Sequence, residues 1–138
     1  MRKIVLHNNT LVYSDDDLEY HWASIYAGFD ENMNFIIVLN ETFDNYDHYE
    51  EIHHIERKGK RYEEIYTYAE LDRDNTAILC QVLGTSLLNL SDAVYDEFND
   101  PYPSYTPSAV KSKFKDITEY LVDIGCKFVV KVETAHHD

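Results

Sequence analysis

The residues best suited to metal or acid–base chemistry are three histidines, His48, His53 and His54, which lie close to the carboxylates Glu50 and Glu51. Imidazole and carboxylate groups together could bind zinc or transfer protons. Their spacing, however, matches no zinc signature such as H-E-x-x-H. On a strand, His53 and His54 would also point to opposite faces and could not share one ion. We therefore predict exposed histidines here, and no metal site, cofactor or catalytic residue.

The two cysteines, Cys80 and Cys126, each lie in an apolar stretch. Neither has the neighbouring sequence of a known nucleophile or redox motif. Buried thiols of this kind are typical of proteins in a reducing compartment. We expect free thiols, with a disulfide as the alternative.

The most unusual feature of the sequence is the stretch 4–56, which contains twelve carboxylates and no Lys or Arg. Aromatic residues are interleaved with these acids. Such a surface suits a basic partner, because carboxylates provide long-range attraction and Tyr or Trp provides rigid contact area. Two further tyrosines lie in the proline-rich segment 99–107, NDPYPSYTP. The predicted partner-binding residues are Asp15, Asp16, Asp17, Glu19, Tyr20, Asp44, Tyr46, Asp47, Tyr49, Glu50, Glu51, Tyr102 and Tyr105.

The formal net charge of −14 narrows the classes of partner. Direct binding to nucleic acid or to an anionic membrane needs clustered Lys and Arg, so both are disfavoured. Solubility alone is the alternative explanation of the charge. The N-terminus has only Ile4, Val5 and Leu6 as an apolar run, too short for a signal peptide. No run reaches the ~20 apolar residues of a membrane span, and we expect a cytoplasmic protein.

The first half of the chain predicts β-strands, because apolar and aromatic residues alternate or form short β-branched runs. The run 35–43 is apolar on both faces and is expected at the centre of a sheet. Gly59 is expected at a hairpin tip within a basic cluster. The predicted strands are 3–13 (or a hairpin that turns at Asn8 and Asn9), 18–29, 35–43, 49–58 and 61–71.

The second half predicts helices, because the apolar spacing changes to three and four residues. Val110, Phe114, Ile117, Leu121 and Ile124 form one such stripe. The predicted helices are 75–83, capped by Asp72 or Asp74 and ended by Gly84; 92–98, capped by Ser91; and 109–124, capped by Ser108 and ended by Gly125. A strand over 126–133 follows, and residues 134–138 are expected to fray.

The segment 76–95, TAILCQVLGTSLLNLSDAVY, resembles a repressor-type helix-turn-helix. That resemblance implies a second helix that reads the major groove of DNA. Here this helix carries Asp92, Asp96 and Glu97 and no basic residue, so phosphates would repel it. We interpret the segment as an ordinary helical hairpin.

These patterns predict a single α+β domain over residues 1–138. We expect an antiparallel β-meander of about five to six strands with helices packed on one face. The strands come first, two or three helices follow, and a C-terminal strand completes the fold.

The function predicted from these features is that of a non-enzymatic, acidic inhibitor. An immunity-type protein would block a basic partner, with a nuclease toxin favoured, through charge-complementary occlusion. The first alternative is a DNA mimic, an antirestriction or anti-CRISPR protein that blocks a DNA-binding enzyme. The second is a small enzyme or ligand-binding domain with a pocket between sheet and helices. The oligomeric state is left open.

Overall fold

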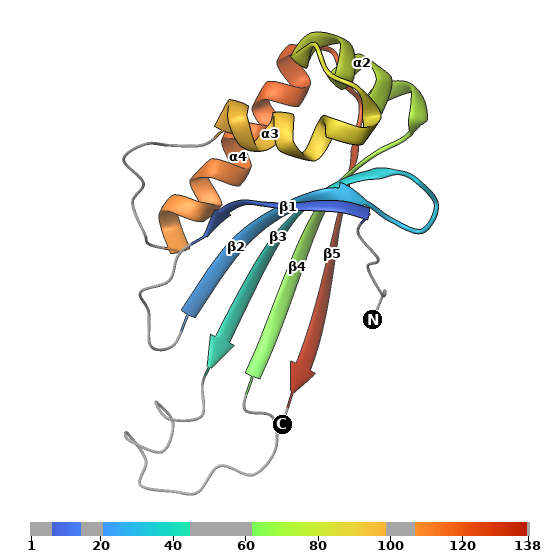
Figure 1. Ribbon diagram of the computed structural model, residues 1–138. Coiled ribbons are helices and arrows are strands. Elements are labelled where there is room, and N and C mark those ends of the chain that lie inside the picture. The colour runs from blue at the N-terminus through green and yellow to red at the C-terminus, as the bar shows by residue number, and fades with distance from the viewer. Residues whose placement is uncertain (1–6, 15–20, 45–61, 99–106, 138) are drawn as a thin grey trace, which may run out of the picture.

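The computed structural model describes residues 7–14, 21–44, 62–98 and 107–137. Within these residues, four antiparallel strands come first, three α-helices follow, and a fifth strand joins the sheet last (Figure 1). This order confirms the predicted α+β fold. In the described residues four strands precede the helices, slightly fewer than the predicted five to six, and β5 follows the helices. The elements are β1 (His7–Ser14), β2 (His21–Phe29), β3 (Phe35–Asp44), β4 (Tyr62–Leu71), α2 (Arg73–Leu83), the 3-10 helix η1 (Leu87–Asn89), α3 (Leu90–Phe98), α4 (Pro107–Asp123) and β5 (Val129–His137).

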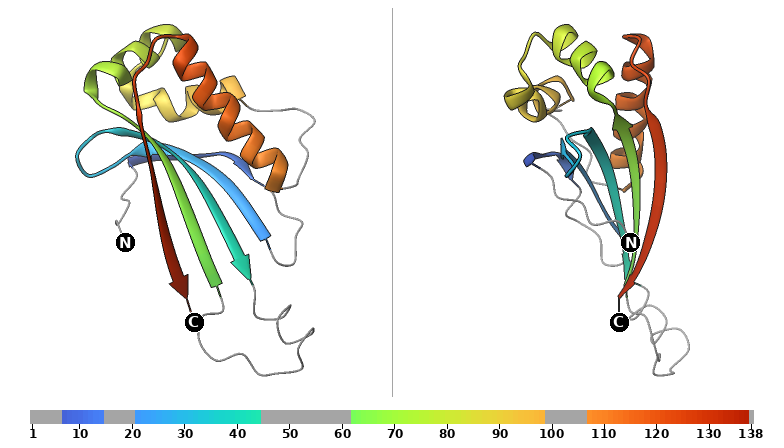
Figure 2. Two further views of the ribbon diagram at one scale, coloured as in Figure 1. Left: turned by 180° about the vertical axis from the view of Figure 1, so that it is seen from behind. Right: turned by 90° about the vertical axis from the view of Figure 1, so that its right-hand side faces the viewer.

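The strands follow one another in the sheet in the order β1-β2-β3-β4-β5, and every neighbouring pair is antiparallel. The central strand β3 pairs in continuous register with both neighbours: Phe35 lies opposite Phe29 of β2 and Leu71 of β4. The three helices gather toward one end of the long strands, and β2 to β5 extend beyond them (Figures 1 and 2).

Strand β3 is buried on both faces, as its unbroken apolar run predicts. Phe35 and Ile37 point into the main core beneath the helices. Ile36 and Val38 form a second, smaller cluster with Tyr68 on the opposite face. The helical layer closes the main core with residues from each helix, namely Leu79, Leu90, Val94, Val110, Ile117 and Leu121. The central-strand prediction is therefore confirmed.

Helix boundaries follow the predicted signals at both ends of α2 and at the end of α4, where Gly125 has a φ of 85°, but not at the starts of α3 and α4. Asp72 caps α2, since its side chain accepts a hydrogen bond from the Asn75 amide, and Gly84 ends the helix in the left-handed conformation. The predicted caps Ser91 and Ser108 are wrong, because both residues lie inside their helices. Helix α4 starts at Pro107, whose fixed φ and missing N–H suit the first position of a helix.

The predicted strand 49–58 and the predicted hairpin tip at Gly59 lie outside the described residues. Strand β4 pairs with β3 from Tyr62 to Leu71 on one side and with β5 from Tyr62 to Glu70 on the other. The last strand differs from its predicted range: it starts at Val129 and continues to His137, which pairs with Tyr62. Residues 134–137 are therefore paired rather than frayed.

Two further features of the described residues bear on the predicted class of protein. Cys80 and Cys126 are both buried and free of disulfides, as expected. No single described helix is long and apolar enough to cross a membrane. Only the segments Arg73–Leu83 and Leu87–Phe98 together reach that length and composition, and they bend by 79° at their break.

Candidate functional site

All of the predicted partner-binding residues except Asp44 lie outside the described residues, as do His48, His53 and His54. Asp44 is the last residue of β3. The structure does, however, place the strand ends from which these segments leave the sheet. Asp44 pairs with Tyr62, and Tyr62 pairs with His137. On the other side of β3, His21 pairs with Phe43.

These pairings define one end of the sheet, which we call the distal end: the edge formed by His21, Asp44, Tyr62 and His137. It is the end that extends away from the helices (Figure 1). The connection 15–20 joins β2 at this end, and the connection 45–61 begins and finishes there. The two connections that contain most of the predicted partner-binding acids are thus attached at the same end of the sheet.

The face of the sheet opposite the helices, here called the second face, carries tyrosines and carboxylates. The rings of Tyr66 and Tyr68 stack with centroids 6.1 Å apart and an interplanar angle of 9°. The Tyr66 hydroxyl donates a short hydrogen bond to Glu64, and the Tyr68 hydroxyl donates to Glu133 of β5 at 3.4 Å. Alternation along β4 therefore places Tyr66 and Tyr68 on the second face, and Ala69 and Leu71 on the face toward the helices.

The tyrosines of the second face act as hydrogen-bond donors. Burial raises the pKa of Tyr66, and the hydrogen bond to the Glu64 carboxylate and its charge raise this pKa further. A phenol in this environment stays protonated at neutral pH and is no nucleophile or base. The pair Tyr66–Glu64 is thus a fixed polar contact of the sheet surface.

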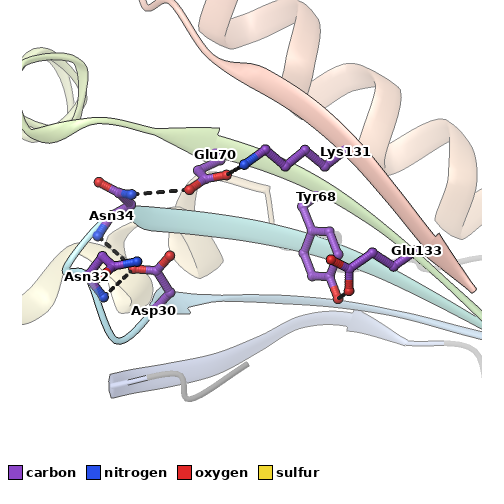
Figure 3. A network of polar contacts seen from close by, with 7 residues as sticks. All are labelled: Asp30, Asn32, Asn34, Tyr68, Glu70, Lys131 and Glu133. Atoms are coloured by element: carbon purple, nitrogen blue, oxygen red, sulfur yellow. Dashed lines mark hydrogen bonds and ion pairs between the residues drawn. The ribbon is translucent and has the colours of Figure 1, made fainter. Parts of the chain in front are cut away.

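A second set of polar contacts ties the start of β3 to β4 and β5 (Figure 3). The Asp30 carboxylate accepts the backbone N–H groups of Asn32 and Asn34 at 2.9 and 3.0 Å. The Asn34 side-chain amide donates to Glu70 at 3.1 Å, and Lys131 Nζ lies 3.0 Å from Glu70. Asp30 fixes the β2–β3 turn, and Glu70 connects adjacent strands. Each carboxylate therefore has a structural role, and no bound substrate is needed to account for its position.

The alternative function, a small enzyme or ligand-binding domain, requires a pocket between sheet and helices, for which no lining residues were predicted. The structure contains a cavity of about 520 Å³ between the β2–β3 turn, α2 and η1. Its described lining contains no His and no carboxylate, so nothing there suggests an acid–base catalyst. The sequence signal for it is a stripe on α2, Arg73, Thr76, Ala77 and Cys80, which share one helical face.

No metal-binding group of three or more His, Cys, Asp or Glu side chains occurs among the described residues. Comparison with known proteins adds no further assignment: no protein-family model, no curated protein and no solved structure matches this chain. Any functional conclusion therefore depends on the geometry and the charges of the chain itself.

Proposed function

We propose that this chain is an acidic, immunity-type inhibitor that acts in the cytoplasm and covers a basic surface of a partner protein. A nuclease toxin is the partner class that fits best, because its substrate cleft must be cationic. The observation that supports this proposal is the register of the sheet, which attaches the connections 15–20 and 45–61 at the distal end.

Charge would act first in this mechanism. Residues Asp15, Asp16, Asp17 and Glu19 contribute four carboxylates to a connection that contains no Lys or Arg. The connection 45–61 also contains acids, but Arg57, Lys58, Lys60 and Arg61 precede β4. We therefore assign electrostatic steering mainly to 15–20, whose field would raise the association rate at low salt.

Tyrosines would then supply contact area once the partner has arrived. Tyr20, Tyr46 and Tyr49 belong to the same two connections as the acids. Tyrosine loses little conformational entropy on binding and combines a large apolar ring with a hydrogen-bonding tip. Steering and anchoring would thus come from the same end of the molecule.

The test starts with the tagged full chain and nuclease-treated lysate of its native host, at low and high salt. The partner recovered at low salt is purified, and its association rate is measured over a range of salt concentrations. The variant Asp15→Asn, Asp16→Asn, Asp17→Asn should associate about tenfold more slowly at low salt, with a weaker salt dependence. The matched control removes three exposed acids from the helices: Asp96→Asn, Glu97→Gln, Asp123→Asn.

The control variant should keep most of the association rate, because its acids lie away from the distal end. Equal losses in both triple variants would show a general charge effect and contradict the assignment to 15–20. Recovery of no basic partner at low salt would reject the inhibitor proposal. Recovery of a DNA-binding enzyme that releases this chain when DNA is added would favour the DNA-mimic alternative.

A further inference from the structure

The cavity between the β2–β3 turn, α2 and η1 has an apolar floor. Phe29 and Thr76 are almost fully buried there, and Cys80 is buried as well. Burial raises the pKa of the Cys80 thiol, so this group is uncharged at neutral pH. A volume of about 520 Å³ lies within the range of small-molecule sites, roughly 300–1,000 Å³.

Two large apolar side chains lie exposed at the rim of this cavity. Met33 and Leu87 are each 54% exposed, although both line an apolar space. Met33 also has a φ of 64°, a left-handed conformation that side chains other than Gly, Asn and Asp rarely adopt. The turn holds it there, since the Met33 amide donates to the Asp30 carbonyl at 3.0 Å. The strained position keeps an apolar thioether at the rim where a polar turn residue would be expected.

The charge at this site has the sign opposite to that of the protein as a whole. Arg73, the first residue of α2, lines the cavity and is exposed. It forms no ion pair with any described carboxylate, including those of its neighbours Asp72 and Asp74. An unpaired guanidinium beside an apolar cavity provides a binding group for a single anion.

We propose that this cavity binds a small organic acid with an apolar body and one carboxylate. The apolar body would lie against Phe29, Cys80 and Ala77, and the carboxylate would face Arg73. This site is independent of the distal end, so it goes beyond the inhibitor proposal.

The test uses decanoate and 1-decanol as probes, both below the concentrations at which they aggregate. Each is titrated into the ¹⁵N-labelled full chain, and binding is followed at the amides of Thr76, Ala77 and Cys80. Decanoate should give saturable shifts and bind more tightly than 1-decanol. Arg73→Gln should weaken decanoate binding about tenfold and leave 1-decanol binding unchanged, because only the acid uses the guanidinium. Lys127→Gln, which removes a surface cation outside the lining, should change neither.

A second pair of variants tests whether the probes bind in this cavity. Ala77→Phe should fill the cavity and abolish binding of both probes, whereas Val82→Phe, also exposed on α2 but outside the lining, should bind both as the unmodified chain does. Retained binding in Ala77→Phe, or the absence of saturable shifts with decanoate, would overturn the site. Equal weakening of both probes by Arg73→Gln, or no weakening, would overturn the assignment to an acid.

Discussion

Lys131 and Glu70 form an ion pair of 3.0 Å across β5 and β4, with the Glu70 side chain only 13% exposed. Glu70 also accepts a hydrogen bond from Asn34, so one carboxylate connects β5 and β4 to the start of β3. The pair Lys115–Glu119 on α4 is different: its atoms are 3.8 Å apart, and both side chains are more than half exposed. The two pairs therefore allow a direct comparison of partly buried and exposed charge.

We expect the partly buried pair to contribute more to stability than the exposed one. A double-mutant cycle with Lys131→Met and Glu70→Gln should give a coupling free energy of about 1 kcal/mol in urea unfolding. The same cycle with Lys115→Met and Glu119→Gln should give about 0.3 kcal/mol, since solvent screens this pair. Equal coupling in the two cycles would contradict the assigned effect of burial.

The N-cap of α2 should make the stability of the fold depend on pH in the acidic range. Hydrogen bonds from the Asn75 backbone and side chain lower the pKa of Asp72 from 3.8. A depressed carboxyl pKa stabilises the folded state above pH 3.8, and this contribution is lost as the pH falls through the lower, folded value. Asp72→Ala should therefore lower the urea midpoint at neutral pH, and the difference from the unmodified chain should shrink below pH 3.8. Asp74→Asn, which removes a charge from the same turn, should not reproduce this pH dependence.

The end of α2 depends on a glycine in the left-handed region. Gly84 has a φ of 66° and donates its backbone N–H to the carbonyls of Cys80 and Gln81. An added Cβ would meet no atom within 4 Å, so the penalty for a side chain is conformational rather than steric. We expect Gly84→Ala to lower the free energy of unfolding by about 1 kcal/mol and Gly84→Asn by less. Gln81→Ala, in the same helix turn, should change it by less than about 0.5 kcal/mol.

The Tyr66–Glu64 contact should make the stability of the fold depend on pH in the alkaline range. The pKa of Tyr66 is raised above 10.0, so the folded state retains this proton more strongly than the unfolded chain. The resulting stabilisation is complete below pH 10 and is lost as the pH rises above it. Tyr66→Phe should therefore lose stability less steeply above pH 10 than the unmodified chain. Identical slopes in denaturant unfolding at several alkaline pH values would show that Tyr66 has an ordinary pKa.

Local sequence signals predicted the elements where local chemistry decides the structure. The unbroken apolar run 35–39 placed β3 at the centre of the sheet, and Asp72 with Gly84 set the limits of α2. The prediction failed where contacts between residues far apart in the sequence decide the structure. Strand β5 starts later than expected: before it, the Lys127 amide donates to the Asn75 side chain at 2.8 Å, and Cys126 contacts the Asn75 carbonyl. Its pairing to His137 depends on the free edge that β4 provides.

The candidate sites were harder to predict from the sequence than the fold. The acids of the chain are visible in the sequence, but their attachment at one end of the sheet depends on strand register. The cavity combines Phe29 of β2 and Met33 of the β2–β3 turn with Arg73 from a helix that follows two strands later. No local pattern contains such a combination, because it arises only when the helices pack on the sheet.

The position of β5 in the chain has a consequence for how the molecule is made. Strand β4 can pair with β3 once both have left the ribosome, but the described partner of its other edge, β5, is synthesised only after α2, α3 and α4. During that interval the nascent chain presents an open edge that could pair with a second chain. Slow translation of the helical segment would prolong the period in which a growing polypeptide depends on chaperones.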